Sequence, residues 1–462
     1  MRRPWGLLAL VIVSAACTGD TTPPTTEAAL PAATQPTIAP SQTATTSPAT
    51  PEIRADGVTV TDDTIYLGVL ADLSGPFSGL VVDIVDAQLV FWADLNERGG
   101  IADRQIELMV SDTGYDVARH RLKYEALRDH VVMFAHSTGS PHTAAIADDL
   151  VADHRLATVA TWYSGWADPV LGANILETGS NYCLEAMNAL TYIAEEQRAQ
   201  AGALPRVAIA TDAGDYGQDS AAGAKHVLAS LGAEVVFDGE GAISSSADLA
   251  AIGAGIAQSG ADWAWLATDP TSSAAIVRAA IQQGYAGEWS GAMPSFSARL
   301  LDTALGDYLS QTWLMSALFT PIGADVEGMG DVYDVLADAF PSRYPSDALV
   351  KGYLEFSVVR SVLERAAEIG DMTPEGLEVA AGSIGSYVFD GLSPANVYAG
   401  NPNDAVTRAS ALYRPSKQLF DQAGGLGASL GAGAASPFVS VEGFFVSPAA
   451  ADYTFEGPCH TL

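Results

Sequence analysis

Hydroxyl, carboxylate and aromatic side chains gather in four short stretches of the chain, and each stretch directly follows a run of apolar residues. The stretches are residues 74–78, 138–140, 162–164 and 212–217. Hydroxyls and backbone amides bind carboxylate or carbonyl oxygens, while aromatic rings enclose an apolar or flat molecule. This combination favours binding of a small organic ligand.

Catalytic chemistry has less support in the sequence. There is no phosphate-binding P-loop, no His-Glu-x-x-His zinc motif and no Cys-x-x-Cys pair. His136 and His142 are six residues apart, a spacing that does not place them on one helix face, so they are interpreted as polar lining rather than metal ligands. We therefore expect a protein that is not an enzyme and uses neither a metal nor a cofactor.

A strand–helix–strand unit must position the first stretch. Residues 65–70 predict a buried parallel strand, because they form a short apolar run, and residues 104–110 predict the next strand. Between them, Val85, Leu89 and Trp92 have the spacing of one apolar helix face. Loops at the carboxyl ends of such strands are where open α/β sheets bind ligands.

The other stretches follow strands of the same kind. After the predicted strand 131–135, Ser140 is expected to cap a helix and Pro141 to lie in its first turn, so that free amides face an anion such as a carboxylate. Further strands are predicted at residues 157–161, 206–210, 233–237, 262–267, 288–291 and 312–319. The last of these is expected to return the chain to the first group of strands. The Gly/Ala-rich residues 424–435 predict a mobile loop, and residues 438–459 one or two extra strands.

The residues of the first unit resemble those of a known family. IYLGVLADLSGPFSG and NERGGIADRQIELMVSDTGYD are similar to the opening of the branched-chain amino-acid (Leu/Ile/Val-type) substrate-binding proteins of ABC importers, and the resemblance extends to about residue 419. It implies the α/β type I periplasmic-binding-protein fold, with two doubly wound, Rossmann-like lobes joined by a three-segment hinge. Residues 62–178 with 319–385 would form the first lobe. Residues 179–318 with 386–462 would form the second lobe and a C-terminal extension.

The resemblance also implies a ligand site between the lobes. It is sharpest at residues 212–217, where an Asp, an aromatic residue and a Gly separate a strand from a helix, so that Tyr216 would reach into the cleft. Ordinary packing remains the alternative for Tyr216 and for Trp162. The candidate ligand-binding residues are Ser74, Phe77, Ser78, Thr138, Gly139, Ser140, Trp162, Tyr163, Ser164, Tyr216, Asp269 and Met293.

One departure from the family concerns the charge of the ligand. Where the family's amino-acid binders carry an acidic residue for the ligand's ammonium group, residues 292–294 are Ala-Met-Pro. A buried ammonium group without a carboxylate partner is strongly disfavoured, so Asp212, Asp215 or Asp269 would have to replace the missing acid. The expected ligand is an amino acid, an amide or a related small carboxylate.

The net charge restricts the other partners. The formal charge of the 462 residues is −33, whereas phosphate binding needs a basic surface, so nucleic acid is excluded and docking on an anionic bilayer is disfavoured. The carboxylates are spread along the chain, which is typical of a well-solvated surface. We expect a monomer.

The first sixty residues predict export. Two arginines precede the apolar run 7–13, which is too short to span a bilayer. Small residues before Cys17 resemble a bacterial lipobox, so residues 1–17 would comprise a lipoprotein signal peptide with a lipidated Cys17. Ordinary secretion with cleavage near Ala16 is the alternative. Residues 18–61, rich in Thr, Pro and Ala, predict a disordered tether that holds the folded part at the outer face of the cell membrane.

Two further cysteines, Cys183 and Cys459, remain. Export permits a disulfide between them, and two buried free thiols are the alternative. A bond would tie the C-terminal extension to the start of the second lobe, whereas chain ends fray unless they are held. The distance between the two Cα atoms decides, because more than about 7 Å cannot be bridged without backbone movement.

Two functions agree with these features. One is the solute-binding subunit of an ABC importer, which delivers its ligand to a permease in the membrane. The other is a sensory ligand-binding protein of the same fold that is not coupled to transport. An enzyme is a distant third.

Overall fold

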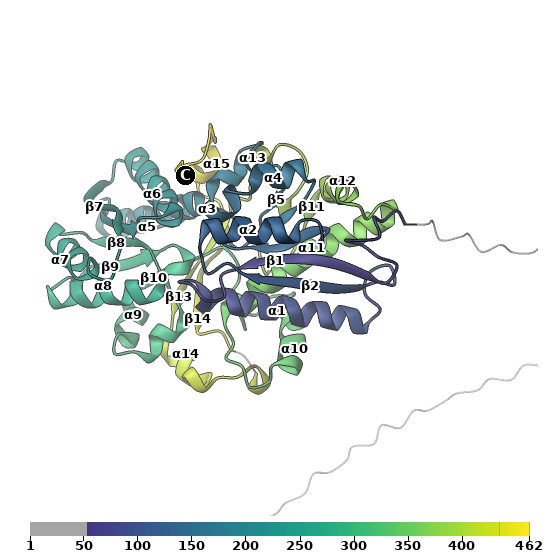
Figure 1. Cartoon of the computed structure of the whole chain (residues 1–462). Coiled ribbons are helices and arrows are strands. Elements are labelled where there is room, and N and C mark those ends of the chain that lie inside the picture. Colours follow the sequence, from purple (N-terminus) through teal and green to yellow (C-terminus); the bar gives the residue numbers. More distant parts are fainter. Residues whose placement is uncertain (1–52, 434, 462) are drawn as a thin grey trace, which may run out of the picture. The chain divides into compact units, whose positions relative to one another are not determined.

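The computed structural model describes residues 53–433 and 435–461, so the predicted signal peptide, Cys17 and most of the predicted tether lie outside the described residues. The last part of the predicted disordered tether is wrong, because Val60 is fully buried and the Arg54 N–H donates to the Gly370 carbonyl at 2.9 Å. The first part of the chain forms a five-stranded parallel sheet with the order β2-β1-β3-β4-β5 (Figure 1). Its strands are β1 Thr64–Ala71, β2 Gln105–Asp112, β3 Met133–Ser137, β4 Ala157–Val159 and β5 Ile175–Leu176.

The second sheet has seven strands in the order β14-β13-β10-β9-β8-β6-β7. Its first five strands along the chain are parallel, and the last two pair antiparallel at one edge. The strands are β6 Arg206–Asp212, β7 Glu234–Ile243, β8 Trp263–Ala267, β9 Glu288–Gly291, β10 Trp313–Ala317, β13 Ser410–Pro415 and β14 Phe438–Phe445. Two parallel-sheet lobes in one α/β chain confirm the predicted fold class.

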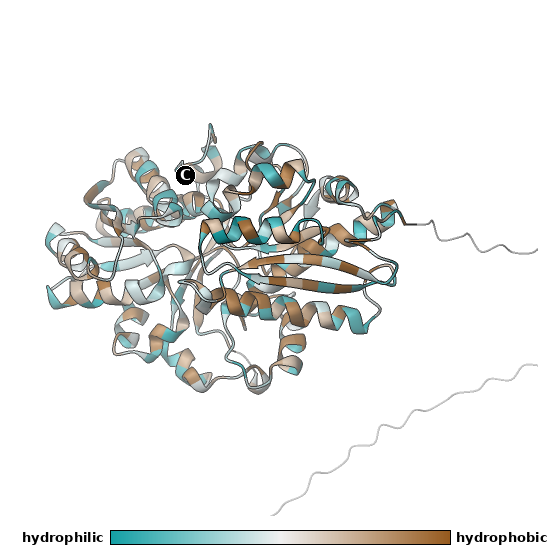
Figure 2. Cartoon of the chain, viewed as in Figure 1, coloured by the Kyte–Doolittle hydropathy of each residue, from teal (hydrophilic) through white to brown (hydrophobic). Residues whose placement is uncertain are grey.

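Helices cover both sheets and complete the two lobes. Hydrophobic residues dominate the strands of the first sheet, whereas α2 on its outer side is largely hydrophilic (Figure 2). The helices of the first lobe are α1 Ser78–Glu97, α2 Val117–Leu127, α3 Ser140–Ala144, α4 Ala147–Ala152, α10 Met329–Ala339, α11 Asp347–Ile369 and α12 Pro374–Ile384. Those of the second are α5 Tyr182–Ala201, α6 Asp215–Leu231, α7 Leu249–Ser259, α8 Pro270–Gln282 and α9 Gly306–Thr312. Short helices α13 Pro402–Ala405, α14 Lys417–Gln422 and α15 Pro448–Asp452 complete the C-terminal part.

The chain passes between the sheets three times, and the crossing segments are bonded to one another. The first crossing lies between β5 and α5, the second follows β10, and the third lies between α12 and β13. The third contains a small antiparallel pair, β11 Ser386–Tyr387 and β12 Asn396–Val397. Asn396 accepts a hydrogen bond from the Gly179 N–H and donates one to the Glu177 carbonyl, and the Thr320 N–H donates to the Leu392 carbonyl at 2.7 Å. These bonds favour a hinge that bends rather than twists.

Two details of the predicted elements are wrong. The strand predicted at residues 312–319 does not return the chain to the first lobe, because β10 pairs with β9 and β13 in the second sheet and the crossing comes after it. On α1, Val85 and Trp92 are buried as predicted, but Leu89 is 43% exposed. Gln88 takes the buried position instead, since its amide donates to the Glu355 carboxylate and to the Ala135 carbonyl.

The Gly/Ala-rich segment docks on the first lobe instead of standing free. Its described part forms short 3₁₀ turns at Gly425–Gly427 and Leu430–Ala432. Leu430 is fully buried and its N–H donates to the Arg343 carbonyl at 2.9 Å. The predicted extra strands beyond it are one strand, β14, followed by the helix α15.

Close packing of α5 against α6 leaves no room for a side chain at Gly223. A Cβ atom there would lie 2.2 Å from the backbone carbonyl oxygen of Cys183. We expect Gly223→Ala to lower the free energy of unfolding by about 1–3 kcal/mol, because the two helices must move apart. Chemical denaturation measures the loss. Gly330→Ala is the matched control, since a Cβ on this exposed position of α10 meets no atom within 4 Å and should leave stability equal or slightly higher. Equal stability of both variants would contradict the packing argument.

Candidate functional site

A cavity of about 140 Å³ lies between the two lobes, at the carboxyl ends of strands from both sheets. The first lobe contributes Leu80, Val81 and Ile84 of α1, and the second contributes Met293, Phe296 and Met315. The aromatic residues in its wall are Phe77, Tyr115, Trp162, Tyr182, Tyr216, Phe296, Phe319 and Tyr344. A mostly apolar wall with a few polar groups is what a small-molecule site requires.

Aromatic rings form a continuous wall from the hinge to the second lobe. The ring centroids of Tyr182 and Tyr216 are 4.6 Å apart, and Trp162 lies edge-on to Tyr182 at 6.0 Å. The Tyr216 hydroxyl shares a hydrogen bond of 3.1 Å with Ser295, which fixes the ring toward the cavity. Burial raises the pKa of Tyr182 and of Tyr216 well above the ordinary value, so both hydroxyls stay neutral.

Hydroxyl groups of the first lobe form the inner polar end of the cavity. Thr138 lines it, but its hydroxyl already pairs with His136 Nε2 at 2.6 Å. Ser140 is almost fully buried, and its hydroxyl has no well-aligned hydrogen-bond partner, although it lies near the Asp215 carboxylate. Ser140 was predicted to cap α3, and this is wrong: Gly139 takes the cap position with φ 96° and Ser140 begins the helix. The glycine conformation therefore leaves the Ser140 hydroxyl facing the cavity.

Asp215 is the acid of the second lobe that faces this inner end. It begins α6, is 6% exposed and lines the cavity. Burial raises its pKa, and the nearby Ser140 hydroxyl opposes that rise. Of the three acids considered for an ammonium group, it alone lines the cavity. Asp269 instead caps α8 through the N–H groups of Thr271 and Ser272, and Asp212 accepts a hydrogen bond from Thr268.

A buried lysine joins the cavity to the hinge. Lys351 of α11 donates to the Val159 carbonyl at 2.9 Å and to the Thr178 hydroxyl, and it lies 3.3 Å from the Glu355 carboxylate. Its ammonium group also lies 4.8 Å from the centre of the Trp162 ring. Burial lowers the pKa of Lys351, which Glu355 partly offsets. The lysine thus holds the end of β4, the first crossing and α11 together.

The structure divides the candidate ligand-binding residues into two groups. Phe77, Thr138, Ser140, Trp162, Tyr216 and Met293 line the cavity. Ser74, Ser78, Gly139, Tyr163, Ser164 and Asp269 lie outside its wall. The Ser74 hydroxyl donates to Asp112 at 2.7 Å, and that of Ser78 donates to the Gly75 carbonyl at 2.7 Å, so both stabilise their own loop.

Several wall residues were not among the candidates. Tyr344 and Lys351 precede or lie in helix α11, and Arg299 lies on a short 3₁₀ turn, Ala298–Asp302. None of the three directly follows a predicted strand, so the pattern of polar and aromatic residues after strands does not identify them. The second crossing of the chain, after β10, brings α11 to the cavity, and only the fold reveals this.

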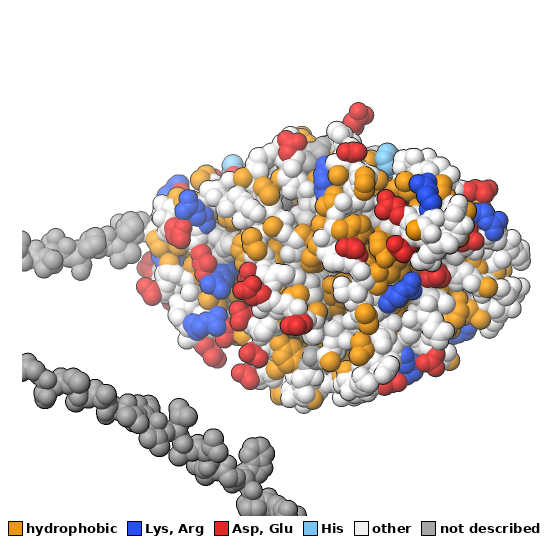
Figure 3. Space-filling view, turned by 180° about the vertical axis from the view of Figure 1, so that it is seen from behind, with side chains coloured by type: hydrophobic (Ala, Val, Ile, Leu, Met, Phe, Trp, Pro, Cys, Tyr) orange, Lys and Arg blue, Asp and Glu red, His pale blue; other side chains and the backbone are white. Residues whose placement is uncertain are grey.

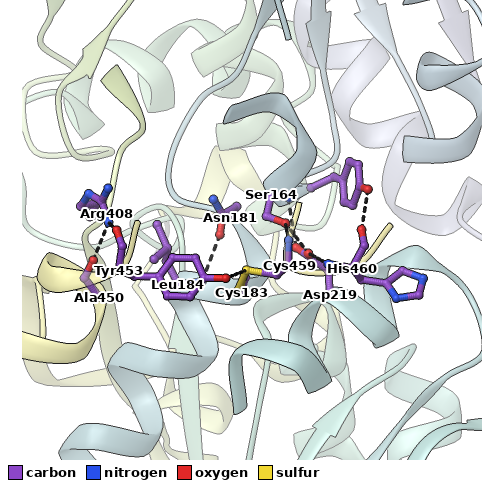
Figure 4. The surroundings of a disulfide bond; sticks show 11 residues. Ser164, Asn181, Cys183, Leu184, Asp219, Arg408, Ala450, Tyr453, Cys459 and His460 are labelled. Carbon is purple, nitrogen blue, oxygen red and sulfur yellow. Dashed lines mark hydrogen bonds between the residues drawn. A yellow bond between two sulfur atoms is a disulfide. The ribbon is translucent and has the colours of Figure 1, made fainter. Parts of the chain in front are cut away.

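Tyr163 and Ser164 hold the C-terminal tail. A disulfide joins Cys183 of α5 to Cys459, with the Cα atoms 6.4 Å apart (Figure 4). The Cys459 N–H donates to the Ser164 hydroxyl at 2.7 Å, and the Tyr163 hydroxyl donates to the His460 carbonyl. Both loop residues therefore use their hydroxyls outside the cavity.

An acid of the second lobe meets the same tail. The Ser164 hydroxyl and the His460 N–H both donate to Asp219 of α6 (Figure 4). Burial raises the pKa of Asp219 to about 7, and the hydrogen bonds from Ser164 oppose the rise. The tail thus contacts the first lobe through Ser164 and the second through Asp219 and the disulfide.

Among the described residues, no group of three or more His, Cys, Asp or Glu side chains is placed to hold a metal ion. In that same part of the chain, no helix is both long and apolar enough to cross a membrane.

Two α/β lobes that supply opposite walls of one cavity, in a chain that passes between them three times, define a type I periplasmic binding protein. The sequence pattern of the periplasmic binding protein family matches residues 64–418, and the chain belongs to that family. The predicted resemblance is confirmed. Comparison with curated proteins gave no match.

Solved structures of ABC transporter proteins share the fold. The chain is similar to the fatty acid ABC transporter substrate-binding protein from Thermomonospora curvata, with 25% identity, 87% of this chain and 97% of that chain covered, and a TM-score of 0.75. It is also similar to a branched chain amino acid ABC transporter protein from Thermus thermophilus with bound valine (17% identity, 84% and 98% covered, TM-score 0.68). A solute binding protein from Rhodopseudomonas palustris in complex with p-hydroxybenzoic acid has 17% identity, 84% and 98% coverage and a TM-score of 0.66. The family and these relatives are solute-binding proteins.

Trp162 offers a direct test of the cavity wall. We expect Trp162→Ala to weaken ligand binding by about 10- to 100-fold, because a large ring would no longer cover the bound molecule. Isothermal titration calorimetry measures the change. Tyr163→Phe is the control, since that ring lies outside the cavity and the substitution removes the hydroxyl that donates to the tail. A larger loss in Tyr163→Phe than in Trp162→Ala would contradict the assigned wall.

Proposed function

We propose that the protein is the extracytoplasmic solute-binding subunit of an ABC importer, which captures one small ligand between its lobes and delivers it to a membrane permease. The observation that carries the proposal is the cavity whose aromatic and apolar wall comes from both lobes. Closure of the lobes would bury a ligand on all sides, and the three bonded crossings suit such a hinge.

The proposed ligand is a small organic acid with an apolar or aromatic body, within the wider class of amino acids, amides and related small carboxylates. Large apolar and aromatic side chains dominate the cavity wall, which supports an apolar body. The relatives named above are described as binding a fatty acid, valine or p-hydroxybenzoic acid. Asp215 offers a place for a hydroxyl or ammonium group, so an amino acid stays within the proposed class.

The proposal includes export and anchoring. Residues 1–17 would act as a lipoprotein signal peptide, the lipid on Cys17 would fix the protein to the outer face of the cell membrane, and residues 18–52 would be a flexible tether that ends where Val60 is buried in the folded part. Acidic side chains are scattered among basic and hydrophobic ones on the face seen in Figure 3, which supports a solvated, monomeric protein that does not bind nucleic acid. No enzymatic reaction is proposed.

A thermal-shift screen of the purified full chain tests the ligand class. The panel contains octanoate, 4-hydroxybenzoate and valine, each with its amide as a neutral counterpart. The proposal expects at least one acid to raise the melting temperature in proportion to its concentration, because ligands that bind only the folded state stabilise it. If no acid or amide shifts the transition, the proposed ligand class is wrong.

A further inference from the structure

Charged side chains in the cavity wall would orient a ligand, because an apolar wall alone does not. Two cations line the cavity, Arg299 and Lys351. Lys351 is fully engaged: its ammonium group pairs with the Val159 carbonyl, the Thr178 hydroxyl and the Glu355 carboxylate. Two hydrogen bonds and this ion pair already occupy its ammonium group, so Lys351 is less available to a ligand than Arg299.

Arg299 is held in place without being neutralised. Its guanidinium group lies 4.4 Å from the centre of the Tyr344 ring. Within the described part of the chain, no carboxylate lies within 4.0 Å of its nitrogen atoms. The residue is exposed and yet lines the cavity, so it marks the mouth. In a chain with a formal charge of −33, a cation that faces a ligand cavity and lacks an acidic partner needs an explanation.

The opposite, inner end of the cavity is unfavourable for an anion. Asp215 lies there beside Ser140, and the negative charges of Asp215, Asp72 and Asp212 all act on the neighbouring Tyr115. The Thr138 hydroxyl is already paired with His136. A ligand carboxylate at this end would face like charges in a buried place, where repulsion is poorly screened. The Ser140 hydroxyl and the Asp215 carboxylate beside it suit a neutral or cationic group instead.

One acidic residue near the mouth could compete with a ligand for Arg299. Asp347 also lines the cavity, and its carboxylate accepts a hydrogen bond from the Ile322 N–H at 2.8 Å. It lies farther than 4.0 Å from Arg299 and forms no ion pair with it. Arg299 therefore keeps the planar pair of donors that binds a carboxylate in bidentate form.

We propose that Arg299 selects the ligand by binding its carboxylate at the mouth of the cavity, so that the apolar body points inward along Tyr182 and Tyr216. The inference rests on the proposed function and deepens it: the ligand is an amphipathic monocarboxylate whose charged end faces outward. A hydroxyl or ammonium group at the far end would meet Ser140 and Asp215. The Tyr344 ring, which also lines the cavity, lies 4.4 Å from the guanidinium group and restricts its position.

Calorimetric titration of the full chain with octanoate or 4-hydroxybenzoate, whichever acid binds, tests this orientation. Arg299→Gln should weaken binding of the acid by about 10- to 100-fold, because a charge-assisted bidentate contact is lost. The same substitution should leave binding of the corresponding amide within about twofold. Arg299→Lys keeps the charge without the planar donors and should fall between wild type and Arg299→Gln.

Two control variants separate the inference from general effects. Arg278→Gln removes an exposed cation of α8 outside the cavity and should leave both affinities unchanged. Ser140→Ala removes the hydroxyl of the inner end and should weaken the acid less than Arg299→Gln does. If Ser140→Ala costs more than Arg299→Gln, or if Arg299→Gln weakens acid and amide equally, the outward orientation is wrong. If wild type binds neither acid nor amide, the proposed function fails instead, which is a distinct result.

Discussion

Loss of the bond between Cys183 and Cys459 should lower the free energy of unfolding by about 4 kcal/mol. The bond joins residues 276 positions apart, so breaking it frees most of the folded chain in the unfolded state. It also releases a tail whose hydrogen bonds connect Ser164 of the first lobe with Asp219 of the second. The Cys459→Ser variant, unfolded by denaturant under oxidising conditions, measures the loss.

The second cysteine supplies the control for this prediction. If the bond is responsible, each single variant already lacks it, and a second substitution has no bond left to remove. The double variant Cys183→Ala/Cys459→Ser should therefore be at least as stable as the weaker of the two single variants. Dithiothreitol should lower the melting temperature of the wild type and leave the double variant unchanged. If dithiothreitol does not change the melting temperature of the wild type, the disulfide does not stabilise the protein.

Replacement of Lys351 should have a similarly large effect. Lys351→Met leaves the fully buried Glu355 without its lysine partner, and removing one member of a buried ion pair costs about 3–5 kcal/mol. Burial alone would raise the pKa of Glu355, but His136 and Lys351 hold it below the ordinary value, so the carboxylate is charged in the folded protein. The loss of stability should appear in denaturant unfolding of the variant.

Neutralising the acid as well should restore part of this loss. In Lys351→Met/Glu355→Gln no unpaired charge stays buried, so we expect the double variant to be more stable than Lys351→Met alone. Lys123→Met, which removes a lysine that is not buried, should be close to neutral. If Lys351→Met unfolds like the wild type, the lysine does not hold the hinge together.

The folded scaffold could be predicted from the sequence to a large degree. The first strand–helix–strand unit follows from short apolar runs and helical spacing, and the observed β1 and β2 agree with the predicted ranges within two residues. The error at Leu89 has a physical cause: spacing alone does not show that Gln88 finds buried partners on a helix far along the chain. Likewise, an apolar run such as β10 does not reveal which sheet it joins.

The lining of the cavity was only half predictable, for a related reason. Strand-end loops yielded Thr138, Ser140, Trp162 and Tyr216, since all four follow recognisable strands. Arg299 lies on a turn that no strand-end pattern marks. Tyr163 is aromatic and follows a predicted strand, as a wall residue should, but its hydroxyl donates to the His460 carbonyl of the C-terminal tail. The position of the tail depends on a cysteine pairing that the sequence left open.

The most direct test of the central claim is a crystal structure of the protein with the tightest ligand found in the thermal-shift screen. We expect that ligand in the cavity between the lobes, in contact with Trp162 and Tyr216, with its carboxylate toward Arg299. A ligand bound on the outer surface of either lobe would contradict the assigned site and the solute-binding mechanism built on it.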